Sequence, residues 1–287
     1  MKVAIYGMTE SGLKGARSER GDRIGNCLAD GFKVHGIDYS LHSRFDGVCA
    51  DVALAYGWIH ELRDKLFTAY KEAGKHFVFF DLGYWNRGHK GAYRVSVDDW
   101  DSARNMLRGC PDDRFRGSRI TFRSDWNSNS KQVTIVGMSD KAAWTHGYKY
   151  MEWEEATKRY LQNKYEGMGF NFVIRHKPRG KEAKKAEPIS EVLRNTYYVV
   201  SHHSNVGVDA IIAGIPYTCR KGVAMHLAPI TNPDDFVRDL HLLRPFIPSF
   251  EQKYNLMCDI AYVQWTTAEM SKGLCWDYIT KVLEKCA

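Results

Sequence analysis

Short apolar runs alternate with segments of helical periodicity in the first part of the chain. The runs predict buried strands, at Lys2–Tyr6, Phe32–Ile37, Val52–Tyr56 and His76–Phe80. A helix is predicted over Arg23–Asp30. Apolar residues at helical spacing predict another over Ile59–Ala73, and Gly74 supplies its expected stop. Strands that alternate with helices predict a parallel sheet covered by helices on both faces.

The alternation of strands and helices stops over residues 94–130, which we interpret as loop-rich with a connector at 124–130. It resumes after this segment. Strands are predicted at Gln132–Val136, Phe170–Ile174, Tyr197–Val200 and Ile215–Cys219, and helices at Tyr150–Tyr165 and Ser190–Arg194. Thr266 and Glu269 match a capping box, followed by Trp276, Ile279, Val282 and Leu283 at helical spacing. The pattern predicts two Rossmann-like α/β domains, 1–128 and 129–287, with the C-terminal helices in the second.

The composition is that of a folded protein. Of the 287 residues, 44% are apolar, which excludes a disordered or fibrous chain. No apolar run reaches the roughly 18 residues of a membrane span, and no signal peptide is visible, so we expect a cytoplasmic protein without membrane contact. The seven cysteines are scattered and form no CxxC pair, which favours reduced thiols over disulfides or a zinc site.

The net charge of +7 favours an anionic partner such as a nucleic acid or a phosphorylated ligand. An ordinary solubility charge is the alternative interpretation.

The most informative segment is Val199–Pro216, in which an apolar run leads into a Ser/His/Asn-rich turn and a helix that stops at Gly214. Ser204 and Asn205 are good N-caps for that helix. Its free N–H groups would face the carboxyl end of the strand, where open α/β sheets bind ligands, and a diphosphate is a natural occupant. Asp209, about one turn further on, would reach a ribose hydroxyl. The alternative is a plain capped helix without a ligand.

A cluster of cations follows another predicted strand, at Arg175, Lys177 and Arg179. Cations at the carboxyl end of a strand suit a phosphate clamp, although basic loop residues are common. We place Arg175 and Lys177 in the donor-binding set, together with Gly137 at the end of the first strand of this block.

Asp81 directly follows a buried strand of the first domain. A carboxylate there would face a cleft between the domains and act as a general base on a hydroxyl nucleophile. Tyr84 and Trp85 would stack on a sugar or base, and Arg87 would orient substrate or pair with Asp81. The alternative is an aspartate that caps its turn, in which case the base is sought at Asp98, Asp99 or Asp101.

Several common motifs are absent. Gly7–Gly12 lacks the GxGxxG spacing, and there is neither a P-loop nor an HExxH zinc motif. His202 and His203 offer metal ligands in principle, but adjacent side chains diverge. We therefore assign His202 and His203 to acceptor or sugar contacts.

Together these segments resemble glycosyltransferases of the two-domain GT-B type. The resemblance rests on Asp81–Tyr84 with Arg87, Arg175–Pro178, Ser201–Ala210, Ala213–Pro216, and the tail Ala261–Thr266 with Glu269 and Gly273. It implies two Rossmann-like domains facing across a cleft, with the acceptor in the first and a nucleotide-sugar, a UDP-sugar such as UDP-glucose, in the second. It implies no obligatory metal.

The chain is short for that class, and compact members in bacteriophages glycosylate hydroxymethylated pyrimidines such as hydroxymethylcytosine in DNA. The resemblance to them implies Asp81 as base and Asp209 as the ribose-binding acid, where the phage enzyme has Glu. It also implies a monomer that binds double-stranded DNA, and it leaves a divalent cation open. The alternatives are a transferase acting on a surface glycan or small molecule, and a non-catalytic nucleotide or nucleic-acid binding module.

Overall fold

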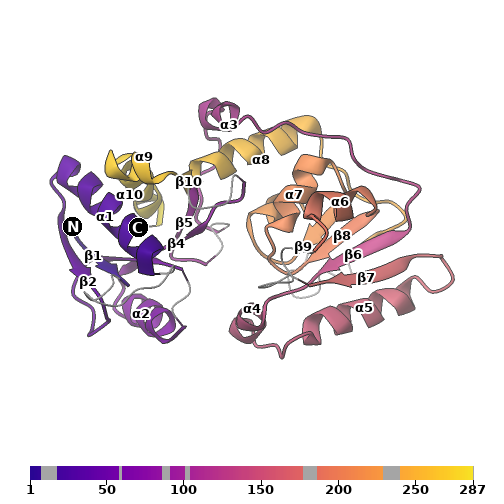
Figure 1. Cartoon of the computed structure of the whole chain (residues 1–287), viewed down its shortest axis with the longest axis horizontal. Coiled ribbons are helices and arrows are strands. Elements are labelled where there is room, and N and C mark those ends of the chain that lie inside the picture. Colours follow the sequence, from indigo (N-terminus) through magenta and orange to yellow (C-terminus); the bar gives the residue numbers. More distant parts are fainter. Residues whose placement is uncertain are drawn as a thin grey trace. The chain divides into compact units, whose positions relative to one another are not determined.

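The protein forms two compact units in a computed structural model. The structure describes residues 1–7, 18–57, 60–85, 91–100, 104–176, 186–228 and 240–286. Unit 1 consists of Met1–Arg114 with Cys258–Ala287, and unit 2 of Phe115–Met257. The C-terminal helices therefore pack with the first unit, whereas the sequence pattern placed them in the second (Figure 1).

Unit 1 contains a six-stranded sheet in the order β10-β5-β4-β3-β1-β2. Its strands are β1 Lys2–Tyr6, β2 Asp38–His42, β3 Val52–Tyr56, β4 His76–Leu82, β5 Tyr93–Val97 and β10 Gln264–Trp265. The first four strands run parallel, as expected. β5 and β10 were not expected, and they add antiparallel pairs at one side of the sheet.

The predicted strand at Phe32–Ile37 is wrong. Helix α1 spans Ser18–His35 and contains most of that segment. Ile24, Leu28 and Phe32 are at most 2% exposed and recur at intervals of four residues, so Phe32 belongs to a buried helical stripe. The strand follows the helix instead, at β2.

Helices cover both faces of this sheet (Figure 1). Helix α2, His60–Glu72, contributes Leu66 and Tyr70 to a core with Phe77 and Phe79 of β4. Gly74 follows α2 with a positive φ of 63°, which confirms the predicted stop. Helix α1 packs against α9, Thr267–Ser271, and against α10, Leu274–Cys286.

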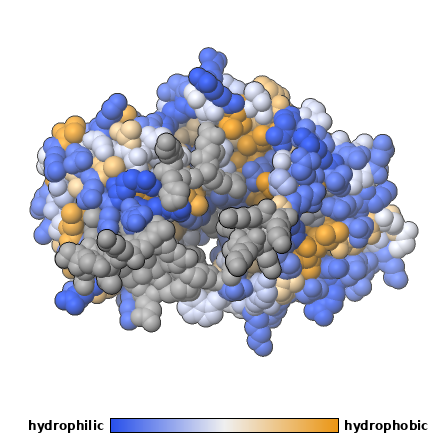
Figure 2. Space-filling view, viewed as in Figure 1, coloured by the Kyte–Doolittle hydropathy of each residue, from blue (hydrophilic) through white to orange (hydrophobic). Residues whose placement is uncertain are grey.

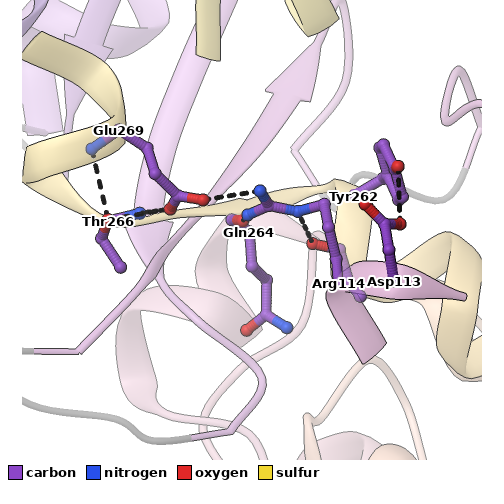
Figure 3. Close-up of polar contacts among 7 residues, drawn as sticks. Asp113, Arg114, Tyr262, Gln264, Thr266 and Glu269 are labelled. Carbon is purple, nitrogen blue, oxygen red and sulfur yellow. Dashed lines mark hydrogen bonds and ion pairs between the residues drawn. The ribbon is translucent and has the colours of Figure 1, made fainter. Parts of the chain in front are cut away.

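Arg114 anchors the C-terminal tail to unit 1 (Figure 3). Its guanidinium donates to the backbone oxygens of Ala261 and Gln264 and to Glu269 Oε1, at 3.2, 2.6 and 2.6 Å. Glu269 Oε2 in turn accepts from the backbone N–H of Thr266 at 2.8 Å. The predicted capping box is confirmed, and the same carboxylate that closes it also binds Arg114.

Unit 2 is built on a four-stranded parallel sheet in the order β7-β6-β8-β9. Its strands are β6 Gln132–Val136, β7 Asn171–Arg175, β8 Tyr198–Ser201 and β9 Tyr217–Cys219. The predicted strands are confirmed to within two residues at their starts. The expectation of two α/β domains thus holds for the fold class.

Helices surround this second sheet. They are α4 Asp140–Thr145, α5 Glu152–Lys164, α6 Ile189–Arg194, α7 Val206–Ala213 and the 3-10 helix η2 Val223–Leu227. Trp153 and Leu161 of α5 join the core formed by Val133, Ile135 and Val200 of the sheet. Two helices lie at the points where the chain passes between units, α3 Asp113–Gly117 and α8 Phe250–Tyr262. The loop-rich interpretation of 94–130 missed α3 and most of β5.

Among the described residues, no helix combines the length and apolar character of a membrane span. Among the coloured residues of Figure 2, hydrophilic ones predominate on the face shown, with smaller hydrophobic areas between them.

Candidate functional site

The carboxyl ends of the unit 2 strands form one row. Arg175, Val136, Ser201 and Cys219 are direct partners across the ladder, in the spatial order β7, β6, β8, β9. The chain leaves β6 toward β7 on one side, and β8 lies on the other, so the connections part between β6 and β8. Such a topological switch point is where open α/β sheets bind ligands.

Helix α7 begins beyond this row. It starts at Val206, and Asn205 occupies the N-cap position without a side-chain cap bond. The Ser204 hydroxyl accepts from the Val206 N–H at 3.2 Å, so Ser204 supplies the capping contact predicted for one of the pair. Gly214 ends the helix with a left-handed φ of 75°, as predicted. Asp209 lies in the first turn and is partly exposed, and its contact with a ribose stays a prediction.

Three histidines gather beside the switch point. His202 and His203 follow β8, and His146 follows α4; the metal-binding atoms of the three rings lie within 4.8 Å of one another. His202 Nδ1 is 3.1 Å from His203 Nδ1. The two adjacent rings thus approach each other, contrary to the expectation that they diverge.

His202 is the buried member of this cluster, at 1% exposure. Burial, followed by the influence of His203, His146, Arg220 and Lys221, lowers the pKa of His202 to about 2. The ring is therefore neutral at physiological pH. A side chain so enclosed is not open to an acceptor or sugar, which corrects the role expected for His202. His203 is half-buried, and its contact with an acceptor or sugar stays a prediction.

Gly137 makes room for a buried carboxylate. Glu154 of α5 is 1% exposed, and its Oε1 accepts a hydrogen bond from the Met138 N–H. A Cβ atom on Gly137 would lie 3.2 Å from that oxygen. Glu154 Oε2 has no hydrogen-bond partner. Gly137 therefore shapes the turn after β6, and a direct ligand contact by Gly137 stays a prediction.

Arg175 ends β7 and is partly exposed. Its Nη2 donates to the backbone oxygen of Glu187 at 2.7 Å, which ties the strand end to the segment before α6. The remaining donors of a guanidinium leave a phosphate contact feasible. Lys177, predicted beside it, and Arg179 lie outside the described residues.

In unit 1, Asp81 lies near the carboxyl end of β4 and is paired with Arg94 of β5. The residues are direct partners in the ladder, and Arg94 Nη2 is 3.1 Å from Asp81 Oδ2. Asp81 Oδ1 accepts from the Leu82 N–H at 2.8 Å. A carboxylate has about four lone-pair sites, so these two contacts leave room for a substrate proton.

The aromatic residues after Asp81 belong to the core. Tyr84 is 2% exposed and Trp85 9%. The Tyr84 N–H donates to Gln264 Oε1 at 2.5 Å, and the Arg94 guanidinium carbon lies 5.5 Å from the Tyr84 ring centroid. This corrects the expectation that Tyr84 and Trp85 stack on a sugar or base. Arg87, the other expected contact, lies outside the described residues.

The alternative bases are engaged elsewhere. Asp98 is paired with His76 at 2.8 Å and accepts from the Phe77 N–H, so it lies at the start of β4, at the opposite end of that strand from Asp81. Asp99 accepts from the backbone of Trp100 and Arg104. Asp101 lies outside the described residues. Asp81 is the aspartate of this set that the structure places near the carboxyl edge.

A further arginine lies in unit 1 on the helix that follows β1. Arg23 Nη2 donates to the Tyr93 hydroxyl at 2.9 Å, and Arg23 Nε is buried without a partner. The ring centroids of Tyr93 and Tyr56 are 5.6 Å apart. Burial raises the pKa of Tyr56, and a hydrogen bond from Arg20 opposes that rise. Both phenols contact arginine side chains near the strand ends.

Sequence reasoning missed His146, Glu154, Arg220 and Arg94. A signal existed for Arg220, because Arg220 and Lys221 directly follow a predicted strand, as Arg175 does. Arg94 was hidden in the segment interpreted as loop. His146 and Glu154 carry no sequence signal that distinguishes them from ordinary helix residues.

No protein-family model matches the chain, and no curated protein matches it. Solved structures that align with it include two of Thermosulfurimonas dismutans KpsC. The β-Kdo 2,4 transferase is 8% identical over 88% of this chain and 89% of that chain, with a TM-score of 0.46. The β-Kdo 2,7 transferase is 10% identical over 96% and 98%, with a TM-score of 0.47. Similarity at this level assigns neither activity nor substrate.

Proposed function

We propose that the protein is a GT-B type glycosyltransferase that moves a sugar from a nucleotide-sugar, most simply a UDP-sugar, to a hydroxyl acceptor. One observation carries the proposal. At the switch point on the carboxyl edge of the unit 2 sheet, Arg175 ends β7, the turn that contains His203 follows β8, and helix α7 begins. The N–H groups of the first turn of α7 bond within the chain, so the contribution of the helix is the positive end of its dipole, which favours a diphosphate as the guanidinium does.

The acceptor is proposed to bind unit 1, with Asp81 as the general base. Asp81 is 39% exposed in its side chain, so a substrate hydroxyl can reach it. As the hydroxyl oxygen attacks the anomeric carbon, its proton passes to the carboxylate and the nucleotide diphosphate leaves. No step of this scheme requires a metal, and a supporting divalent cation stays open.

For the acceptor itself we propose the hydroxymethyl group of a modified pyrimidine in double-stranded DNA. The net charge of +7 and the resemblance to phage enzymes support it. A base in a duplex would have to be flipped out to react, and affinity should fall steeply with salt. A surface glycan or small molecule is the alternative acceptor, and salt-independent activity without DNA affinity would favour it.

The test is incubation of the full chain with a panel of nucleotide-sugars and hydroxymethylated duplex DNA, followed by mass analysis of the nucleosides. A hexose added only to the hydroxymethylated base supports the whole proposal. Donor turnover on other hydroxyl acceptors, without DNA modification, refutes the DNA acceptor alone. Tight nucleotide binding with no transfer to any acceptor refutes the enzyme and favours a binding module.

A further inference from the structure

The histidine cluster of unit 2 has a fourth member that determines its chemistry. Arg220 directly follows β9, and its Nη1 lies 3.4 Å from His202 Nε2 and 2.6 Å from the Tyr148 hydroxyl. His202 Nδ1, on the other side of the same ring, faces His203 Nδ1 at 3.1 Å. His202 is therefore held between a guanidinium and a second imidazole.

Three imidazoles in one place ordinarily suggest a transition-metal site. Arg220 argues against it here. A metal-bound histidine normally donates its other ring N–H to an acceptor, but a guanidinium has donors only. A metal bound at His202 Nδ1 would place the ring proton on Nε2, where it faces the N–H groups of Arg220. A metal bound at Nε2 would lie next to the positive charge of the guanidinium.

We propose that Arg220 is a positioning residue that sets a one-way hydrogen-bond relay, Arg220 to His202 to His203. Because Arg220 can only donate, His202 Nε2 must accept, and the single proton of the neutral His202 ring lies on Nδ1. That Nδ1–H donates to His203 Nδ1. In its neutral form the His203 ring then carries its proton on Nε2, and the Arg220 charge polarises it through His202.

This deepens the donor site and rests on the proposed function for its consequence. His203 immediately precedes Ser204 and the start of α7. An imidazole with its proton on Nε2 donates from that atom and does not accept there, so His203 serves as a hydrogen-bond donor to a phosphate oxygen of the nucleotide-sugar. It serves neither as a base nor as a metal ligand.

The relay is tested in the ligand-free full chain by long-range proton–nitrogen NMR of the histidine rings, which distinguishes protonated from unprotonated ring nitrogens. His202→Gln and His203→Gln assign the signals. We expect His202 protonated on Nδ1 and His203 on Nε2. His202 protonated on Nε2 overturns the proposal, and so does stoichiometric Zn²⁺ binding that shifts the signals of all three rings.

Matched variants separate the relay from general stability. Arg220→Met should redistribute the protons of both rings, whereas Tyr148→Phe removes the other Arg220 contact and should leave the pattern intact. Arg220→Lys keeps a charged donor and should preserve the pattern if the Met variant fails to fold. An Arg220→Met spectrum unchanged in a folded protein overturns the proposal.

A binding measurement connects the relay to the donor site. Pyrophosphate is the probe, and Arg220→Met should weaken its binding about tenfold while Tyr148→Phe leaves it near the unsubstituted value. Equal effects of the two variants overturn the functional role. If His202 is protonated on Nδ1 and His203 on Nε2 but the protein transfers no sugar, the proposed function is refuted and the relay stands. If the enzyme is active but His202 is protonated on Nε2, the relay is refuted and the proposed function stands.

Discussion

Arg94 Nη2 lies 3.1 Å from Asp81 Oδ2, across the β4–β5 ladder in which the two residues are direct partners. Arg94 is the more enclosed of the two, with its side chain 12% exposed against 39% for Asp81. The ion pair therefore fixes the position of the carboxylate while leaving one side of it open. A fixed, partly exposed carboxylate is the arrangement that a general base needs.

Asp81→Asn keeps the size of the side chain but removes its ability to take a proton. General base catalysis contributes about 10²–10⁴-fold, so we expect kcat to fall by at least about two orders of magnitude. Donor affinity should change little, because the proposed donor contacts lie in the other unit. Steady-state kinetics, donor titration and thermal unfolding on one preparation provide the measurement.

Asp98→Asn is the control for that experiment. It removes the charge that pairs with His76 and leaves an amide oxygen that still accepts from the Phe77 N–H, so it should lower the stability of the same unit while sparing kcat per folded molecule. If Asp81→Asn is folded and retains a near-normal kcat, Asp81 has no part in the chemistry.

Nucleotide binding to unit 2 should stabilise the protein. A ligand selective for the folded state adds RT ln(1 + [L]/Kd), about 2.7 kcal/mol at a hundredfold excess over Kd. A nucleoside diphosphate should therefore raise Tm, and Arg175→Ala should reduce that rise. Arg194→Ala is the control, since Arg194 pairs with Glu191 of α6 and both side chains are exposed. An equal rise in both variants would remove Arg175 from the proposed donor site.

The sequence was informative where local pattern and burial agree. Buried parallel strands are continuous apolar runs, and His76–Phe80 and Gln132–Val136 were found for that reason. The strand predicted at Phe32–Ile37 was wrong because Phe32, a residue of a helical apolar stripe, forms with Val34 and Ile37 an apolar pattern typical of a strand. β5 alternates Tyr93, Val95 and Val97 with polar residues, a pattern hidden by the surrounding glycines and aspartates.

The candidate site was predictable only in part. The turn after β8 and the cation after β7 follow directly from strand ends, so their common location is a consequence of a parallel sheet. The approach of Arg220 and His146 to His202 depends on how strands β9, β8 and helix α4 pack in three dimensions. No spacing in the sequence encodes it.

Glu269 should make the stability of unit 1 sensitive to acid. Burial favours its neutral form, but the Arg114 ion pair and the bonds from Thr266 outweigh burial and lower the pKa of Glu269 below its ordinary 4.5. A lowered pKa in the folded state means stability that is complete above about pH 4.5. That contribution is lost as the pH falls through the lower folded value.

Glu269→Gln should therefore reduce the free energy of unfolding most above pH 4.5, and the gap to the unsubstituted protein should narrow in acid. Urea unfolding across a pH series gives the measurement. Glu284→Gln substitutes an exposed residue of α10. Its free energy of unfolding, plotted against pH, should run nearly parallel to that of the unsubstituted protein. A constant gap at every pH for Glu269→Gln would show that ionisation of Glu269 does not stabilise the fold.

Gly214→Ala should destabilise unit 2 through two separate causes. Gly214 adopts a φ of 75° and its added Cβ would lie 2.6 Å from the Arg123 backbone oxygen. The left-handed conformation costs a non-glycine residue about 1–2 kcal/mol, and the steric overlap adds about 1–3 kcal/mol.

Gly147→Ala isolates the first cause, since Gly147 has a φ of 77° with nothing within 4 Å of its added Cβ. We expect Gly214→Ala to lose at least about 1 kcal/mol more than Gly147→Ala in urea unfolding. The excess arises because residues 123–125 close the end of α7, with the Arg123 N–H donating to the Ile212 oxygen at 2.7 Å. Equal losses in the two variants would mean that this segment yields to a methyl group and does not hold the helix that begins at the proposed donor site.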